Sequence, residues 1–122
     1  MTEPKYPFLY APIRACLRGP RNDPRTVAVL LVPVADGRPL VVKAELPDDS
    51  DGAAVAEARD FIFEEANFAA DLRTTDPEAL LRWWLARAGQ QADFVYLSKP
   101  MAGCAADLGA EAQAILDAYI AT

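Results

Sequence analysis

Residues 26–46 read TVAVLLVPVADGRPLVVKAEL, and this stretch decides the fold. Val27 to Val34 is apolar almost throughout, which is typical of a central strand that is covered on both faces. Asp36-Gly37 favours a tight hairpin turn, because both residue types tolerate a positive φ. The alternation that follows predicts a returning strand from Leu40 to Leu46. Its inward-facing set is Leu40, Val42, Ala44 and Leu46.

Another strand is expected on the N-terminal side of this pair. From Tyr10 to Arg18 the side chains alternate with a period of two. The apolar face of that strand consists of Leu9, Ala11, Ile13, Ala15 and Leu17. The segment from Gly19 to Arg25 is dense in turn residues and predicts a loop between this strand and the next. The three strands are expected to form an antiparallel meander.

The second half of the chain is composed mainly of helix-forming residues, whereas eight of the ten prolines lie at or before residue 47. The acidic segment 47–52 is expected to cap the first helix. The expected elements are a helix from about Ala53 to Leu72, a helix from Asp76-Pro77 to near Gly89, a short strand at Asp93–Ser98, a loop at Lys99–Gly103 and a last helix within Cys104–Ile120. The predicted fold is an α+β two-layer sandwich of order βββααβα, with a mostly antiparallel four-stranded sheet and three helices, in one domain spanning residues 1–122.

The composition excludes several kinds of site. The chain has 122 residues and no histidine, which rules out a Ser-His-Asp triad or a histidine-ligated metal within it. Its two cysteines, Cys16 and Cys104, are too few for a disulfide scaffold or an all-cysteine zinc site. We therefore expect no metal and no cofactor.

The net charge argues against a protein that binds nucleic acid over its whole surface. The formal net charge is −6. Residues 1–47 carry seven Lys/Arg against four Asp/Glu, whereas residues 48–122 carry five against fourteen. The beginning of the chain lacks the pattern of a secretory signal, and no apolar run approaches the roughly 20 residues of a membrane span. A cytoplasmic protein with reduced thiols and no membrane contact is expected.

Glu65 is the first candidate for chemistry. At about 100° per residue, it projects near the middle of the apolar arc of the first predicted helix. That arc consists of Ala54, Val55, Ala58, Phe61, Ile62, Phe68, Ala69 and Leu72. A carboxylate there suits a general acid or base, or a group that anchors a ligand in a cleft near Cys104 and the N-terminal arginines. The alternative is a carboxylate paired with an arginine, or a helix rotated so that Glu65 lies at the rim.

Several aromatic side chains are expected to lie outside the core or at its edge. Phe63 falls about 150° from the centre of the apolar arc, where it is expected to meet water. Trp84 is assigned to the core, whereas Trp83 lies on the flank of its helix, one turn from Arg87. Three roles are open for Trp83: it covers the edge of the fold, lines a cleft or contacts a partner. Tyr6 and Phe8 share one face of an extended first strand, and aromatic side chains of this kind often anchor interfaces.

Two further groups are weaker candidates. Cys104 follows Gly103 at an expected helix N-terminus, where the helix dipole favours a thiolate, but the alternative is a small buried cysteine. Arg14, Arg18, Arg21 and Arg25 lie on the first strand and the loop after it, where guanidinium groups can bind phosphates or carboxylates. Solvated arginines, some of them paired with acidic helices, are the alternative for this cluster.

Three helices on one face of the sheet would leave its second face open. A homodimer through that face is the simplest cover, and an N-terminal segment folded over its own sheet is the other.

The leading hypothesis is a small acidic protein-binding module, such as an inhibitor, immunity factor, adaptor or chaperone-like protein, and not an enzyme. Phe63, Trp83, Asp60 and Glu64 are its expected contact residues, within an acidic face that suits a basic partner. The first alternative is a small-molecule binder or simple enzyme that uses Glu65, with Cys104 as a further catalytic candidate. The second is an anion or nucleic-acid contact through the four arginines.

Overall fold

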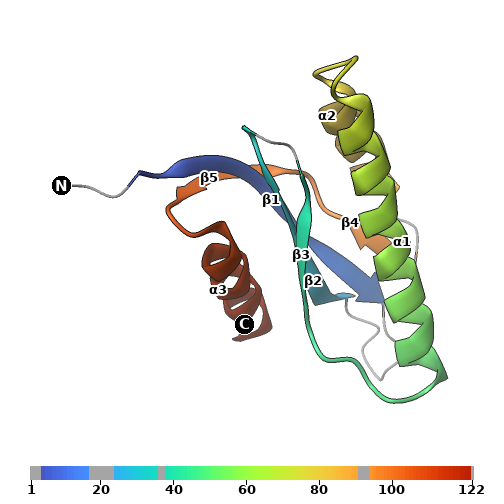
Figure 1. The fold of residues 1–122 in the computed structure, drawn as a ribbon. Helices are drawn as coiled ribbons and strands as arrows, with labels where there is room; N and C mark the ends of the chain where they lie inside the picture. Colours follow the sequence, from blue (N-terminus) through green and yellow to red (C-terminus); the bar gives the residue numbers. More distant parts are fainter. Residues whose placement is uncertain (1–3, 17–23, 36–37, 91–93, 122) are drawn as a thin grey trace.

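An antiparallel sheet with helices on both sides organises the chain (Figure 1). The computed structural model describes residues 4–16, 24–35, 38–90 and 94–121. Its elements are β1 (Tyr6–Cys16), β2 (Pro24–Pro33), β3 (Leu40–Lys43), α1 (Ser50–Leu72), α2 (Ala79–Ala88), β4 (Val95–Leu97), β5 (Met101–Ala105) and α3 (Leu108–Ala121). The order βββααββα confirms the predicted α+β fold with an antiparallel sheet and three helices, and adds one strand to it.

The two longest strands, β1 and β2, lie at the centre of the sheet. The strand order is β3-β2-β1-β4, and β5 also pairs with β1. Every residue from Val27 to Pro33 is buried, so the predicted central strand is confirmed. The expected hairpin residues Asp36-Gly37 lie outside the described residues, but β2 and β3 pair antiparallel as the hairpin requires.

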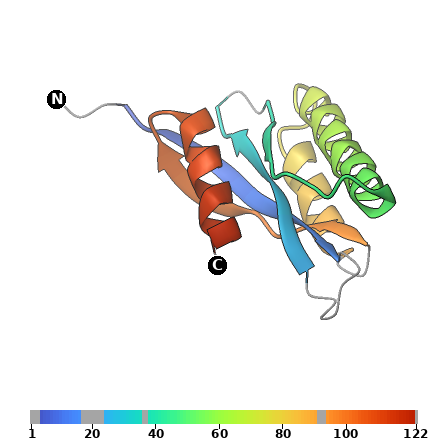
Figure 2. The same ribbon diagram turned by 90° about the horizontal axis from the view of Figure 1, so that it is seen from below.

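The sheet is covered on both faces, because β2 is apolar on both. Leu30 and Val32 belong to a main core together with α1 and α2, whereas Leu31 belongs to a second core with Ala112 of α3. Neighbouring residues of a strand point to opposite faces, so α3 lies across the sheet from α1 and α2. Figure 2 shows α3 on one side of the strands and the other two helices on the other side. The layers are therefore helix, sheet and helix, and α3 covers part of the face that was expected to remain open.

The segment after β4 differs most from the sequence-based expectation. The predicted loop at Lys99–Gly103 is largely strand β5, and the last helix begins at Leu108 instead of near Cys104. Gly103 lies opposite Phe8, and a Cβ at residue 103 would be 2.7 Å from the Phe8 ring. The small residues of β5 thus give room to an aromatic ring from the neighbouring strand.

The start of α1 follows the predicted capping chemistry, whereas α2 begins at Ala79, later than Asp76-Pro77, and its N-cap residue Glu78 makes no side-chain cap hydrogen bond. The Asp49 side chain accepts a hydrogen bond from the Gly52 backbone N–H at 2.8 Å, which caps α1. Asp107 caps α3 in the same way, by accepting from the Ala110 N–H at 3.0 Å. Trp84 is fully buried as predicted, and its indole N–H donates to the Ser98 carbonyl at 2.9 Å. None of the described helices is long and apolar enough to cross a membrane.

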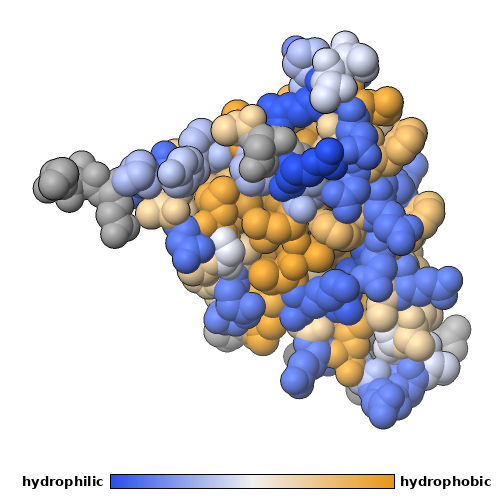
Figure 3. All heavy atoms as spheres, in the orientation of Figure 1, coloured by the Kyte–Doolittle hydropathy of each residue, from blue (hydrophilic) through white to orange (hydrophobic). Residues whose placement is uncertain are grey.

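The β3 edge of the sheet is open and apolar on both of its faces. Leu40 and Val42 pack toward the second core, and Val41 packs toward the main core. Figure 3 shows apolar side chains gathered between α3 and α1, where Figure 1 places β3. The strand has only four residues and ends at Lys43, whose ammonium pairs with Asp60 at 2.9 Å. A short edge strand that ends in a charged lysine is poorly suited to receive another strand.

Candidate functional site

Helix α1 presents three of its large apolar side chains to solvent. Phe61 is 57% exposed, Phe68 is 67% exposed and Leu72 is 46% exposed, although all three belong to the arc that was expected to be buried. Val55 and Ile62 are buried as predicted. The buried residues of α1 are Gly52, Val55, Arg59, Ile62, Ala66, Ala69 and Ala70. Their mean direction differs from that of the expected arc by roughly a quarter of a turn of helix.

Arg59 accounts for much of this rotation. Its side chain is buried against the sheet, and Nη1 donates to the Val27 carbonyl at 3.1 Å and to the Ala44 carbonyl at 3.2 Å. Burial lowers the pKa of Arg59, and the charge of neighbouring Asp60 partly opposes this shift. No ion pair to Arg59 is formed by the residues that the structure describes, so the two carbonyls are the groups that hold the guanidinium in place.

Glu65 lies at the rim of the core and is engaged by α2. The indole N–H of Trp83 donates to Glu65 Oε2 at 3.0 Å, and Arg87 Nε lies 4.0 Å from the same oxygen. The carboxylate is half-buried, so both parts of the alternative interpretation apply, namely the arginine partner and the rim position. The Trp83 ring also meets Trp84 edge-on, with 6.5 Å between the ring centroids. Glu65 therefore fixes the orientation of Trp83.

A pocket of about 360 Å³ opens on this side of the molecule. We call it the Glu65 pocket; its lining consists of Phe61, Glu64, Glu65, Phe68 and Trp83. Neither Cys104 nor any of the four N-terminal arginines is part of that lining. Cys104 is exposed on strand β5 and precedes the first residue of α3 by four positions, so the expected helix N-terminus at this thiol is wrong.

The expected contact residues divide between the surface and the core. Glu64 is exposed and lines the Glu65 pocket, and Asp60 is exposed and paired with Lys43. Phe63 is half-buried against the main core, so its expected position in water is wrong. Phe8 is also a core residue, at 2% exposure, whereas Tyr6 is 49% exposed.

The sequence did not single out Phe61 and Phe68 as surface residues. Both were placed in the buried arc because their spacing matches that of Ile62 and Ala69. A usable signal was the group of small residues Ala66, Ala69 and Ala70, which marks the face where a helix can approach its neighbours closely.

Two of the four N-terminal arginines share a cavity. Arg14 and Arg25 line a space of about 550 Å³ together with Tyr119 and Ile120 near the end of α3. Arg14 Nη2 donates to the Pro24 carbonyl at 3.1 Å. Arg18 and Arg21 lie outside the described residues. The C-terminal end of a helix carries partial negative charge, so α3 itself supplies a favourable partner for these guanidinium groups.

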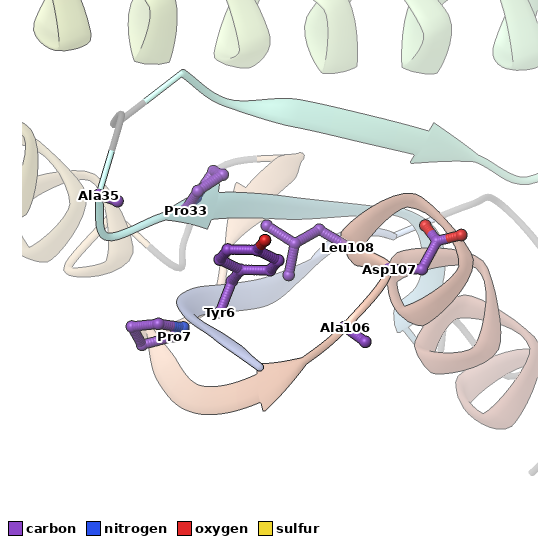
Figure 4. Close-up of a pocket in the computed structure, with 7 residues that line it drawn as sticks. All are labelled: Tyr6, Pro7, Pro33, Ala35, Ala106, Asp107 and Leu108. Carbon is purple, nitrogen blue, oxygen red and sulfur yellow. The ribbon is translucent and has the colours of Figure 1, made fainter. Parts of the chain in front are cut away.

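A further cavity of about 540 Å³ lies between the start of β1, the end of β2 and the start of α3. Figure 4 shows the ring of Tyr6 beside Leu108, with Pro7 and Pro33 nearby. Its side-chain polar groups are the Tyr6 hydroxyl and the Asp107 carboxylate, and Asp107 already caps α3. This lining suits apolar contact better than acid–base chemistry.

Comparison with other proteins adds no functional information. No family model, curated protein or solved structure matches the chain. In the described part of the chain, no group of three or more Cys, Asp or Glu side chains is placed to hold a metal ion.

Proposed function

We propose that this protein is a protein-binding module, of the inhibitor, immunity, adaptor or chaperone-like kind, and that it docks through α1 and α2 at the Glu65 pocket. The observation that carries the proposal is the pair Phe61 and Phe68, each more than half exposed and both lining a pocket with Trp83. Clustered exposed aromatic side chains mark interaction sites more often than single ones do.

The energetics favour docking over a purely structural role for these rings. Complete burial of one phenylalanine side chain contributes about 1.5–3 kcal/mol relative to water. Phe61 and Phe68 forgo much of this contribution in the isolated chain, because each exposes most of its side chain. A partner that covers both rings and fills the pocket recovers it.

The arrangement of Glu65 supports binding better than catalysis. Oε2 of Glu65 accepts the Trp83 N–H and lies near Arg87, so one of the two carboxylate oxygens is held by α2. Three of the five residues that line the pocket are aromatic, which suits apolar contact with a partner. The carboxylate thus serves to hold Trp83 as a rigid wall of the pocket, as an interface anchor requires.

The test is quantitative capture of proteins from a lysate of the source cells with three forms of the chain. The forms are the wild type, the double variant Phe61→Ser/Phe68→Ser and the control Leu85→Ser/Ile120→Ser. Leu85 is 51% exposed and Ile120 is 55% exposed, and neither lines the Glu65 pocket. We expect a partner that the wild type and the control retain and the Phe61/Phe68 variant loses.

Circular dichroism of all three forms checks that each is folded. Capture of the same proteins in the same amounts by the wild type and by the folded Phe61/Phe68 variant would overturn the proposal.

A second candidate function rests on the cavity that Arg14 and Arg25 line. Two guanidinium groups beside a space of about 550 Å³ can bind an anion such as phosphate. Phosphate binding followed by calorimetry should weaken as salt is raised and disappear in Arg14→Gln/Arg25→Gln. Binding that survives this double substitution, or its absence in the wild type, excludes this function.

A further inference from the structure

One side of α1 carries a mostly apolar stripe with the spacing of a helix–helix seam. We call it the outer stripe; it consists of Ala54, Ala58, Phe61, Glu65, Phe68 and Leu72. Four of these residues are exposed, whereas Ala58 and Glu65 are half-buried. The intervals alternate between four and three residues, which is the spacing of the a and d positions of a heptad repeat. The stripe covers about 27 Å of helix at 1.5 Å per residue. Its geometry matches a second helix lying alongside α1.

One flank of the outer stripe is acidic at each heptad position. Glu57, Glu64 and Asp71 follow one another at intervals of seven residues, and all three are exposed. Asp71 already pairs with Arg38 at 2.7 Å, so Glu57 and Glu64 carry most of the charge that a partner would meet. They occupy the g positions when Ala58 and Glu65 are a positions. The residues at the e positions, Val55, Ile62 and Ala69, are buried in the main core. A partner helix that packs along the outer stripe therefore has carboxylates on one side and the Trp83 side chain on the other.

We infer that the partner presents an amphipathic helix with a row of Lys or Arg beside its apolar face, which docks along the outer stripe and inserts one large apolar side chain into the Glu65 pocket. This inference rests on the proposed function and specifies the chemistry of the partner. The Glu65 pocket interrupts the seam at its only charged position, where Phe61, Phe68 and Trp83 surround the space that the side chain would fill.

The same charges disfavour the other possible occupants. In an antiparallel pair of α1 helices the g positions of the two copies face each other, so the acidic rows would repel. In a parallel pair the g positions would face e positions, and these are buried in each copy. A membrane with anionic lipids repels a row of carboxylates as well.

The experiment uses two synthetic helical peptides of three heptads, both with Leu at a and d. One carries Lys at e and g, and the other carries Glu there. The full chain is titrated with each peptide by fluorescence anisotropy at low and high salt. We expect the basic peptide to bind at least about tenfold more tightly than the acidic one at low salt, and less tightly as salt rises.

Charge reversal supplies the matched variants. Glu57→Lys/Glu64→Lys should weaken binding of the basic peptide by about tenfold or more and strengthen binding of the acidic one. The control Glu111→Lys/Asp117→Lys makes the same change of net charge on α3, across the sheet from the outer stripe, and should leave the preference unchanged. Phe61→Ser/Phe68→Ser should lose both peptides.

The inference fails if the two peptides bind equally, or if neither binds. It also fails if the wild-type chain dimerises through Phe61 and Phe68 in sedimentation, or binds vesicles of phosphatidylcholine and phosphatidylserine through them. A cellular partner that depends on Phe61 and Phe68 but is insensitive to Glu57→Lys/Glu64→Lys would overturn this inference and leave the proposed function standing. The absence of any such partner would remove the proposed function itself.

Discussion

The two faces of α1 differ in a way that hydropathy alone does not explain. The face toward the sheet contains Arg59 and several small residues, whereas the face toward solvent contains Phe61 and Phe68. The small residues allow α1 to approach its neighbours closely, and the guanidinium satisfies two backbone carbonyls at the end of the β2–β3 pair. Close packing and hydrogen bonding determine the inward face here, which leaves the aromatic rings available on the outward face.

The largest expected difference in the free energy of unfolding is between substitutions at two consecutive residues of α1, Ile62 and Phe61. Ile62→Ala should lower the free energy of unfolding by about 3 kcal/mol, because Ile62 is fully buried and its loss leaves a cavity. Phe61→Ala should change it by no more than about 0.5 kcal/mol, because most of that ring is already in water. Urea unfolding monitored by circular dichroism measures both values. Equal losses for the two variants would mean that the outward face is also packed.

Arg59 provides the next largest effect. Arg59→Ala should cost about 2–3 kcal/mol, because it leaves a cavity and removes a donor from the Val27 and Ala44 carbonyls. Arg59→Met should cost at most about 1 kcal/mol, because it fills the space and removes a buried charge. If methionine proves as harmful as alanine in urea unfolding, the hydrogen bonds matter more than the volume.

The sign of the pH effect at Arg59 follows from its lowered pKa. Around neutrality the guanidinium is protonated in both the folded and the unfolded chain, so the difference between wild type and Arg59→Met should not vary with pH there. Only at alkaline pH, between the lowered pKa of Arg59 in the folded chain and the ordinary pKa of an arginine in the unfolded chain, does the unfolded chain hold more protons. The wild type gains stability relative to the variant as pH rises through that window.

The smallest expected effect on the free energy of unfolding is at the hydrogen bond between Trp83 and Glu65, because Glu65 lies between the buried and the exposed face of α1. Trp83→Phe keeps the ring but removes the donor to Glu65, and should cost about 1 kcal/mol of unfolding free energy. Glu65→Gln retains an acceptor for the Trp83 N–H and should cost about half as much or less. The emission of Trp83, compared in a Trp84→Phe background, reports whether its environment becomes wetter. A larger loss for Glu65→Gln than for Trp83→Phe would mean that the carboxylate charge, and not the hydrogen bond, holds the site.

Much of the fold could be predicted from residues with strong local signals. The apolar run of β2 and the capping residue Asp49 gave the right elements in the right places. Strand β5 was missed because Gly103 and its small neighbours lack strand propensity, and their pairing depends on the Phe8 ring of a strand distant in sequence. The residues of β5 alone therefore do not reveal that this segment contacts Phe8.

The candidate site was only partly predictable, for a related reason. Glu65 and Trp83 were recognised as unusual, Glu64 was named as an expected contact residue, and the structure brings the three together in one pocket. The rotation of α1 could not be derived, because an arc centred on Glu65 is more apolar than the arc that is buried. What selects the buried arc is the contact of Arg59 with two carbonyls, which only the assembled sheet provides.

Strand β1 has a consequence for how the chain matures during synthesis. One edge of β1 pairs with β2, which follows it closely in the chain, but the other edge pairs with β4 and β5. Those two strands come from residues 95–105, which follow both α1 and α2 in the chain. While the chain emerges from the ribosome, β1 therefore keeps one side unpaired until both of these helices have been made. Closure of the sheet on that side thus depends on a pairing between segments that are far apart in the sequence.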